Sequence, residues 1–232
     1  RTQRHGDTPI NDQPHSTRYV DLYDWEDGDM VDDQDKIRML VDPTSDYVKA
    51  MVASLNRAKD DVIISSLGGN SRSTSGNIIL PTAQKIAVGG TNLTKAKIIQ
   101  AKTLFRTNEA DEEAGEELYM LYNAAAAAQI LADTTLTSTD YLAGQFLREG
   151  SVRGKWMGFN WIPTERCPKV STTRFLYAYA KSGVTLGKGA DIMTKVGEDP
   201  GKGFNVRIYA KMSIGSVRVE EEKVVEIACL EP

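Results

Sequence analysis

The sequence has 232 residues, of which 41% are hydrophobic and 26% are charged, so the chain can bury a substantial core as one large domain or two small ones. Its formal net charge of −4 excludes a general electrostatic attraction to nucleic acid, so contact with DNA is expected to be non-specific only. It contains no apolar run of about eighteen residues and no signal-peptide core, which excludes membrane-spanning and exported proteins and predicts that it stays in the cytoplasm where it is made.

The start of the chain is polar and is interrupted by Pro9 and Pro14, so it cannot bury enough surface to fold by itself. We interpret residues 1–15 as an extended excursion. Apolar and aromatic side chains then alternate in part from Thr17 to Trp25, which predicts a strand that returns towards the body of the protein. An acidic stretch follows this predicted strand, from Glu26 to Asp35.

The clearest helix is predicted from Asp46 to Leu67. Apolar residues recur there at intervals of three and four, which places them along one side of a helix that packs against a core. Thr44 or Ser45 can cap the first amides, and Gly68-Gly69 end the helix. At 1.5 Å per residue this helix reaches roughly 33 Å, nearly the width of a small domain.

A less regular stretch follows the helix. We interpret it as a polar loop over Gly69–Gly76, then a pair of short strands at Ile78–Leu80 and Lys85–Val88, and then a turn at Gly89-Gly90. Glycine pairs are typical of tight turns, because glycine adopts left-handed backbone conformations without a steric penalty.

A second helix is predicted to begin near residues 92–94 and to carry Ile98, Ala101 and Phe105 on one face. A polar connection then leads to a strand at Leu118–Tyr122, which is rich in apolar and aromatic residues.

Alanines dominate the next segment. Asn123 is placed to cap a helix over Ala124–Ala132, because alanine has the highest helix propensity and loses no side-chain entropy. A further short helix is predicted at Tyr141–Arg148 and ends at Gly150, and an aromatic-rich strand is predicted at Lys155–Ile162.

From Thr173 onward the sequence predicts β-structure. The best stretch is Asn205–Gly215, where apolar and polar residues alternate with a period of two, so one face of this strand must be buried. The apolar members are Val206, Ile208, Ala210, Met212 and Ile214. Because helices and strands are mixed irregularly and no repeated βαβ unit occurs, the predicted class is α+β.

No set of residues has the spacing of a catalytic centre. His5 and His15 lie in the polar start without a second ligand at helical spacing, and the sequence has neither a phosphate-binding loop nor a nucleophile elbow. Cys167 and Cys229 lack CxxC spacing, so we interpret them as packed free thiols in a reducing compartment. The sequence predicts a protein that is not an enzyme and binds no cofactor.

The acidic stretch invites a calcium-binding interpretation. The loop pattern D-x-D-x-D-G before Gly28 would require carboxylates where the sequence has Tyr23 and Trp25, so it fails at two of its three acidic positions. A metal-dependent hydrolase that uses this stretch is a distant alternative. Calorimetric titration with calcium, magnesium or manganese would identify it.

Opposite charges lie close together in the sequence, on the start of the chain and on the acidic stretch. Such complementarity can specify which surfaces of two copies meet, so we predict a contact between subunits here. The candidate interface residues are Arg1, Arg4, His5 and Arg18 on the basic side and Glu26, Asp27, Asp29, Asp32, Asp33 and Asp35 on the acidic side.

Four segments carry a family likeness and occur in the same order over nearly the whole chain. They read RHGDTP, STRYVDLYDWEDGDMVDDQDKIRMLVDPTSDYV, NRAKDDVII and YAKMSIGSVRVEEEKVVEIAC. The parts DDQDKIRMLVDPTS and SIGSVRVEEEKVVEIAC are the most specific. On these segments the chain resembles a family of tailed-bacteriophage major capsid proteins, whose fold is similar to that of the Hong Kong 97-type capsid subunit.

The resemblance implies an α+β subunit of Hong Kong 97-like capsid fold, with an A domain, a P domain and an E-loop. Residues 1–40 would form the tip and returning strand of the E-loop and the lead into the P domain. Residues 41–90 would form the P domain with its spine helix, residues 91–202 the A domain, and residues 203–232 the returning strands of the P domain.

The function that the resemblance implies is that of a major capsid protein. Pentamers and hexamers of the protein would build the icosahedral shell that encloses the packaged DNA genome of a tailed bacteriophage. The protein would reside in the virion after assembly in the host cytoplasm, with scaffolding, portal and possible cement proteins as partners. The closest alternative is the shell of an encapsulin-like cellular compartment, which has the same fold and which a basic, hydrophobic cargo-binding groove would favour.

The predicted strand at Thr17–Trp25 is one half of a loop that leaves the body and returns. Its antiparallel partner is expected before Arg1, because a lone projecting strand is only marginally stable. We therefore expect the native polypeptide to carry an extended arm and an ascending strand upstream.

Overall fold

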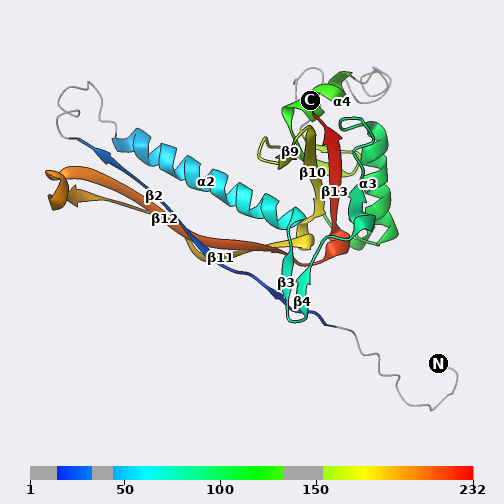
Figure 1. Cartoon of the computed structure of the whole chain (residues 1–232), viewed down its shortest axis with the longest axis horizontal. Coiled ribbons are helices and arrows are strands. Elements are labelled where there is room, and N and C mark those ends of the chain that lie inside the picture. The colour runs from blue at the N-terminus through cyan, green and yellow to red at the C-terminus, as the bar shows by residue number, and fades with distance from the viewer. Residues whose placement is uncertain (1–14, 33–43, 133–153, 232) are drawn as a thin grey trace, which may run out of the picture.

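The computed structural model describes residues 15–32, 44–132 and 154–231, which form an elongated arm joined to a more rounded body (Figure 1). Helices and strands are mixed in both parts, so the predicted α+β class is confirmed. The helix predicted at Tyr141–Arg148, with Gly150 at its end, lies outside the described residues. None of the described helices is long and apolar enough to span a membrane.

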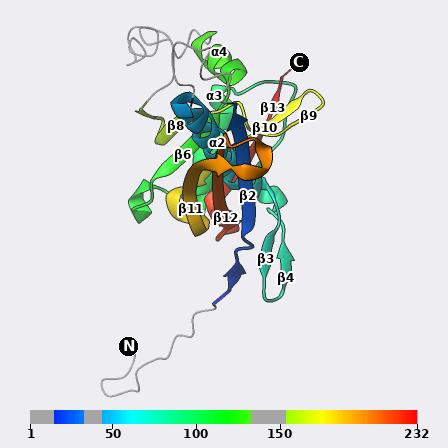
Figure 2. The same ribbon diagram turned by 90° about the vertical axis from the view of Figure 1, so that its left-hand side faces the viewer.

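The arm consists of one long helix on one face of a three-stranded antiparallel sheet. The helix is α2 (Thr44–Gly68), and the strands are β11 (Val184–Asp199), β12 (Asn205–Arg218) and β2 (Tyr23–Val31), in that order across the sheet. Figure 2, which looks along the arm, shows the three strands side by side. With 25 residues, α2 is roughly 37 Å long, and the prediction of a helix at Asp46–Leu67 is confirmed to within two residues at each end.

The core of the arm lies between α2 and β12. Ile208, Ala210, Met212 and Ile214 of β12 are at most 2% exposed and cluster with Met51 and Leu55 of the helix. The register predicted from the alternation over Asn205–Gly215 is therefore confirmed. Burial of each large apolar side chain contributes about 1.5–3 kcal/mol to stability, so this interface holds the helix on the sheet.

Arg218, at the body end of β12, joins this strand to the end of α2. Its guanidinium is fully buried and donates hydrogen bonds to the carbonyl oxygens of Leu67, Gly69 and Ile78 at 2.9, 2.7 and 3.1 Å. The last carbonyl groups of a helix have no partner within the helix, and here a buried arginine supplies one.

The body is built on a seven-stranded mixed sheet. Its strands run in the order β5 (Lys85–Ile86), β13 (Val224–Leu230), β10 (Thr173–Ala180), β6 (Leu118–Tyr122), β8 (Phe159–Pro163) and β7 (Lys155–Trp156), with β9 (Lys169–Val170) beside β10. The pairs β5–β13 and β6–β8 are parallel, and the other pairs are antiparallel.

Two helices, α3 (Lys95–Thr107) and α4 (Ala124–Ala132), pack against the core of the body. The predicted apolar face of α3 is buried. Asn123 accepts a hydrogen bond from the backbone N–H of Ala126 at 3.0 Å, which confirms it as the cap of α4. The strand predicted at Leu118–Tyr122 has the same bounds in the structure.

A small third sheet lies at the junction of arm and body and consists of β1 (Arg18–Tyr19), β3 (Ser71–Ser73) and β4 (Gly76–Ile78). The prediction of a loop at Gly69–Gly76 and of pairing between Ile78–Leu80 and Lys85–Val88 is wrong. β4 pairs with β3 instead, and β5 pairs with the distant β13. The serines of β3 carry no apolar alternation, so the pattern gave no strand signal.

Two further strand predictions need correction. The strand predicted at Lys155–Ile162 is a hairpin, because Met157 and Gly158 both have positive φ, 50° and 82°, as a two-residue turn requires. The strand predicted at Thr17–Trp25 is interrupted between Tyr19 and Tyr23, and its second part continues through the acidic residues to Val31. The turn predicted at Gly89-Gly90 is confirmed by φ values of 53° and 68°.

Cys167 and Cys229 are buried, free thiols. Burial raises the pKa of Cys167 to about 12 and that of Cys229 to about 11, so both stay protonated in the folded protein at pH 8. We expect neither to react with a water-soluble disulfide reagent at pH 8 until denaturant unfolds the protein.

The same pKa values predict how these thiols affect stability. An unfolded cysteine has a pKa of about 8.5, which is below the pKa of either buried thiol. The contribution of the two thiols to the free energy of unfolding is therefore fully present below about pH 8.5 and is lost as the pH rises towards 11–12. Rapid modification of either thiol in the native protein at pH 8 would contradict this burial.

Candidate functional site

The acidic stretch forms much of β2, which lies at one edge of the arm sheet. Carboxylates are typical of exposed edge strands, because charge opposes unwanted pairing with another strand. Arg18, Glu26, Asp27, Asp29 and Asp32 are the candidate residues that the structure describes. Arg1, Arg4, His5, Asp33 and Asp35 lie outside the described residues.

Neighbouring acidic residues of β2 point to opposite faces of the sheet, as in any strand. Glu26 lies opposite Lys211 of β12, whereas Asp27 lies opposite the buried Ala210. Glu26 also accepts a hydrogen bond from Tyr209, which raises the pKa of that tyrosine. Among the described residues, no three His, Cys, Asp or Glu side chains are grouped so that they could hold a metal ion.

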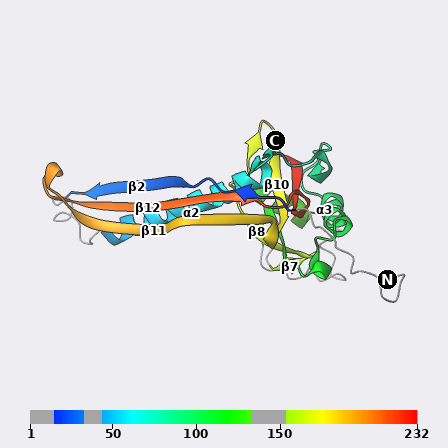
Figure 3. The ribbon, with the colours of Figure 1, turned by 90° about the horizontal axis from the view of Figure 1, so that it is seen from below.

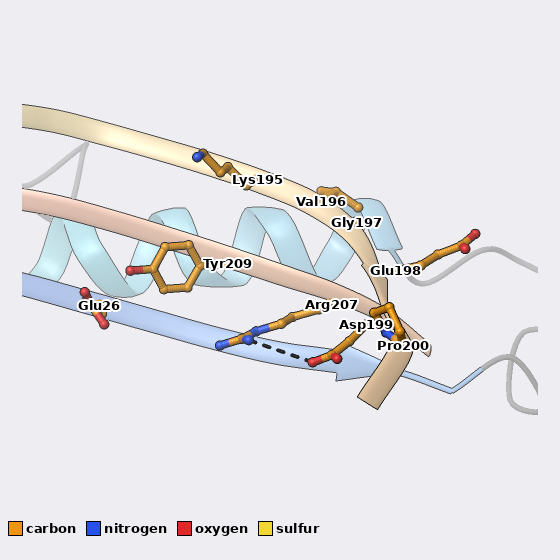
Figure 4. Close-up of a pocket in the computed structure, with 9 residues that line it drawn as sticks. All are labelled: Glu26, Lys195, Val196, Gly197, Glu198, Asp199, Pro200, Arg207 and Tyr209. Carbon is orange, nitrogen blue, oxygen red and sulfur yellow. Dashed lines mark ion pairs between the residues drawn. The ribbon is translucent and has the colours of Figure 1, made fainter. Parts of the chain in front are cut away.

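A shallow groove of about 650 Å³ lies on the face of the arm sheet opposite α2, near the β11–β12 hairpin (Figure 4). It presents charges of both signs, from Glu26 and Asp199 and from Lys195 and Arg207. Arg207 and Asp199 form an ion pair at 3.8 Å. The groove is therefore a surface of mixed charge.

Arg18, one of the four predicted basic interface residues, is engaged within the chain. Its guanidinium donates hydrogen bonds to both carboxylate oxygens of Glu221, at 3.2 and 3.1 Å, and its side chain is only 10% exposed. The structure therefore does not bring Arg18 to the acidic stretch.

Exposed apolar side chains gather where β1 leads into β2. Tyr19, Leu22, Tyr23 and Trp25 are between 37% and 63% exposed. Large apolar side chains grouped on a surface mark sites of protein–protein contact. The alternation over Thr17–Trp25 predicted a strand and gave no sign that these side chains lie on the surface.

Two features at the arm–body junction were not predicted from the sequence. No sequence pattern indicated that Arg218 is buried, because a single arginine before an acidic run is typical of a solvated surface. Gly187, Gly189 and Gly215 lie within strands, and an isolated glycine within a strand pattern is a recognised sign that another backbone approaches closely.

Comparison with known proteins gives a match over nearly the whole chain. A protein-family model described as "Phage capsid protein" matches residues 1–231. No curated protein matches the sequence.

Solved structures share the fold at low sequence identity. A structure from Mycobacterium phage Che8 has a TM-score of 0.68 at 17% identity, and the match covers 88% of this chain and 70% of that one. The capsid of cyanophage P-SCSP1u has a TM-score of 0.65 at 15% identity, with 100% of this chain and 81% of that one covered.

An encapsulin also shares the fold. The SrpI encapsulin complex from Synechococcus elongatus PCC 7942 has a TM-score of 0.56 at 9% identity, with 91% of this chain and 74% of that one covered. At these identities, the structural likenesses establish the fold and leave function to the family match.

Proposed function

The chain belongs to the phage capsid protein family, and on that premise we propose how its arm, its body and its charged segments serve the shell. It is a major capsid protein, a structural and non-enzymatic subunit with the Hong Kong 97-like capsid fold. Copies of it assemble into the shell of a bacteriophage virion. The observation that carries this conclusion is the family match over residues 1–231.

In the proposed domain organisation, α2 with β11, β12 and β2 forms the P domain, and the seven-stranded sheet with α3 and α4 forms the A domain. Strand pairing supports these groups. β11 falls within the 91–202 segment yet pairs with β12, and β13 falls within 203–232 yet pairs with β10. These groups shift the boundaries expected from the sequence. Within the segment 1–40, residues 1 to about 23 are the tip and returning strand of the proposed E-loop.

We propose that the shell is icosahedral and contains pentamers and hexamers, because closed symmetry lets one subunit surface be used repeatedly. Scaffolding, portal and cement proteins are the proposed partners, and assembly takes place in the host cytoplasm. The net charge of −4 supports only non-specific contact with the packaged DNA.

Sedimentation velocity tests the proposed function. The polypeptide as its gene encodes it, expressed with and without a scaffolding partner, should sediment far faster than the 25.5 kDa of this chain predicts. A compact monomer at high concentration under both conditions would defeat the proposal.

We also propose that the basic start of one copy contacts the acidic β2 edge of a neighbouring copy. Glu26 and Asp29 are exposed on this edge, so their carboxylates are accessible in the isolated subunit. Opposite charges steer association and are screened by salt.

Reversal of Arg1 and Arg4 to glutamate is therefore expected to lower the yield of complete shells, most clearly at low ionic strength. Lys95→Glu, at an exposed position at the start of α3, is the matched control and should leave the yield unchanged. Unchanged assembly of the double reversal at low ionic strength would count against this contact, though not against the capsid assignment.

A further inference from the structure

Between β1 and β2 the chain crosses the face of the arm sheet opposite α2, and it does so over three glycines (Figure 3). Gly187 of β11 lies beside Gly215 of β12 in the strand register, and Gly189 follows on β11. Ile214 is buried against α2, so Gly215 points to the opposite face, where residues 20–22 cross.

The crossing is so close that side chains at these positions would collide with it. A Cβ atom on Gly215 would lie 2.0 Å from the carbonyl oxygen of Asp21. A Cβ on Gly187 would lie 2.8 Å from Cγ1 of Val20, and one on Gly189 would lie 3.0 Å from Cδ1 of Leu22. None of the three has a positive φ, so glycine is required here for space and not for backbone conformation.

Independent contacts anchor both ends of the crossing. On one side, β1 pairs with β3, Arg18 is bound to Glu221, and Arg72 donates a hydrogen bond to Asp21 at 3.0 Å. On the other side, β2 pairs with β12 from Tyr23 onward. Residues 20–22 are thus held between two fixed points and against the glycines.

We propose that Gly187, Gly189 and Gly215 form a glycine seat that fixes the path of residues 20–22 and thereby positions the E-loop for contact with a neighbouring subunit. The inference rests on the proposed shell function and on the assignment of residues 1 to about 23 to the E-loop. None of residues 20–22 belongs to the apolar core of the arm or of the body, so this segment contributes little to the stability of either. The glycine seat therefore affects assembly by positioning the E-loop.

Alanine substitutions with a matched control test this seat. Gly187→Ala places a methyl group against Val20, and Val20→Ala removes the atom it meets, leaving Cδ2 of Leu22 at 3.4 Å as the nearest neighbour. Gly197→Ala is the control on the same strand, because a Cβ there has nothing within 4 Å. The two readouts are amide hydrogen exchange over residues 18–25 and the yield of closed shells.

Gly187→Ala is expected to make the amides of residues 18–25 exchange about tenfold faster and to lower the shell yield by about tenfold. The Gly187→Ala/Val20→Ala double variant should return to within about twofold of the parent, as expected for a pair coupled by direct contact. Gly215→Ala should be more severe, because it meets backbone, and Gly197→Ala should behave like the parent.

The seat is overturned if Gly187→Ala behaves like Gly197→Ala in both readouts, or if Val20→Ala does not relieve its effect. Should Gly187→Ala be insoluble, recovery of soluble protein in the double variant supports the seat, and continued insolubility overturns it. If the parent and Gly197→Ala both fail to form shells, the proposed function is refuted instead. The hydrogen-exchange comparison of Gly187→Ala with Gly197→Ala would still test the glycine seat.

Discussion

Replacement of Arg218 by methionine is expected to leave little or no soluble subunit. The side chain is 0% exposed, and its loss would leave the carbonyl oxygens of Leu67, Gly69 and Ile78 buried without their hydrogen-bond donor. An unsatisfied buried polar group is destabilising by about 1–3 kcal/mol, so the summed loss is expected to exceed about 3 kcal/mol, a large part of a typical domain's stability.

The measurement is the midpoint of denaturant unfolding, together with the soluble fraction of expressed protein. Arg218→Lys keeps the positive charge but cannot reach all three carbonyls in the same geometry, so it should be intermediate. Arg207→Met is the matched control, because Arg207 is 57% exposed, and its ion pair with Asp199 at 3.8 Å and its contact with the ring of Tyr209 both lie at the surface. Equal unfolding midpoints for Arg218→Met and Arg207→Met would show that the buried network does not hold β12 to the end of α2.

Ile208→Asp is expected to prevent soluble folding, and Met212→Asp should do the same. Both side chains lie on the buried face of β12, at 0% and 2% exposure, between the sheet and α2. A carboxylate there loses the apolar contacts and places an unpaired charge in the core, which is destabilising by several kcal/mol.

Asn205→Asp, on the opposite face of the same strand, should be tolerated, because Asn205 is only half-buried and lies outside the arm core. Soluble yield and far-ultraviolet circular dichroism of the three variants give the comparison. Equal solubility of all three would show that the register of β12 is wrong.

The longest and most regular elements could be predicted from the sequence. α2 and β12 both carry a sustained apolar period, and Asn123 precedes an alanine run, so local chemistry determines these elements. Elements that lack an apolar period of their own could not be predicted. β3 is a strand because β1 and β4 flank it, and β2 continues through acidic residues because β12 offers it an edge.

The same reasoning explains the partial success at the candidate site. The acidic stretch could be located, yet its alternation across an edge strand depends on pairing with β12. Arg18 is hydrogen-bonded to Glu221, which lies 203 residues away in the sequence, and no local sequence pattern predicts such a pair. The spacing of residues could only argue against catalytic sites. The prediction of a capsid protein came from the resemblance of whole segments to a known family.

Electron microscopy of negatively stained particles, made from the polypeptide as its gene encodes it, tests the central claim most directly. If the protein is a capsid subunit, the images will show closed shells of uniform diameter whose averages have fivefold and threefold symmetry. Monomers or irregular aggregates alone, at high concentration and with a scaffolding partner present, would contradict it.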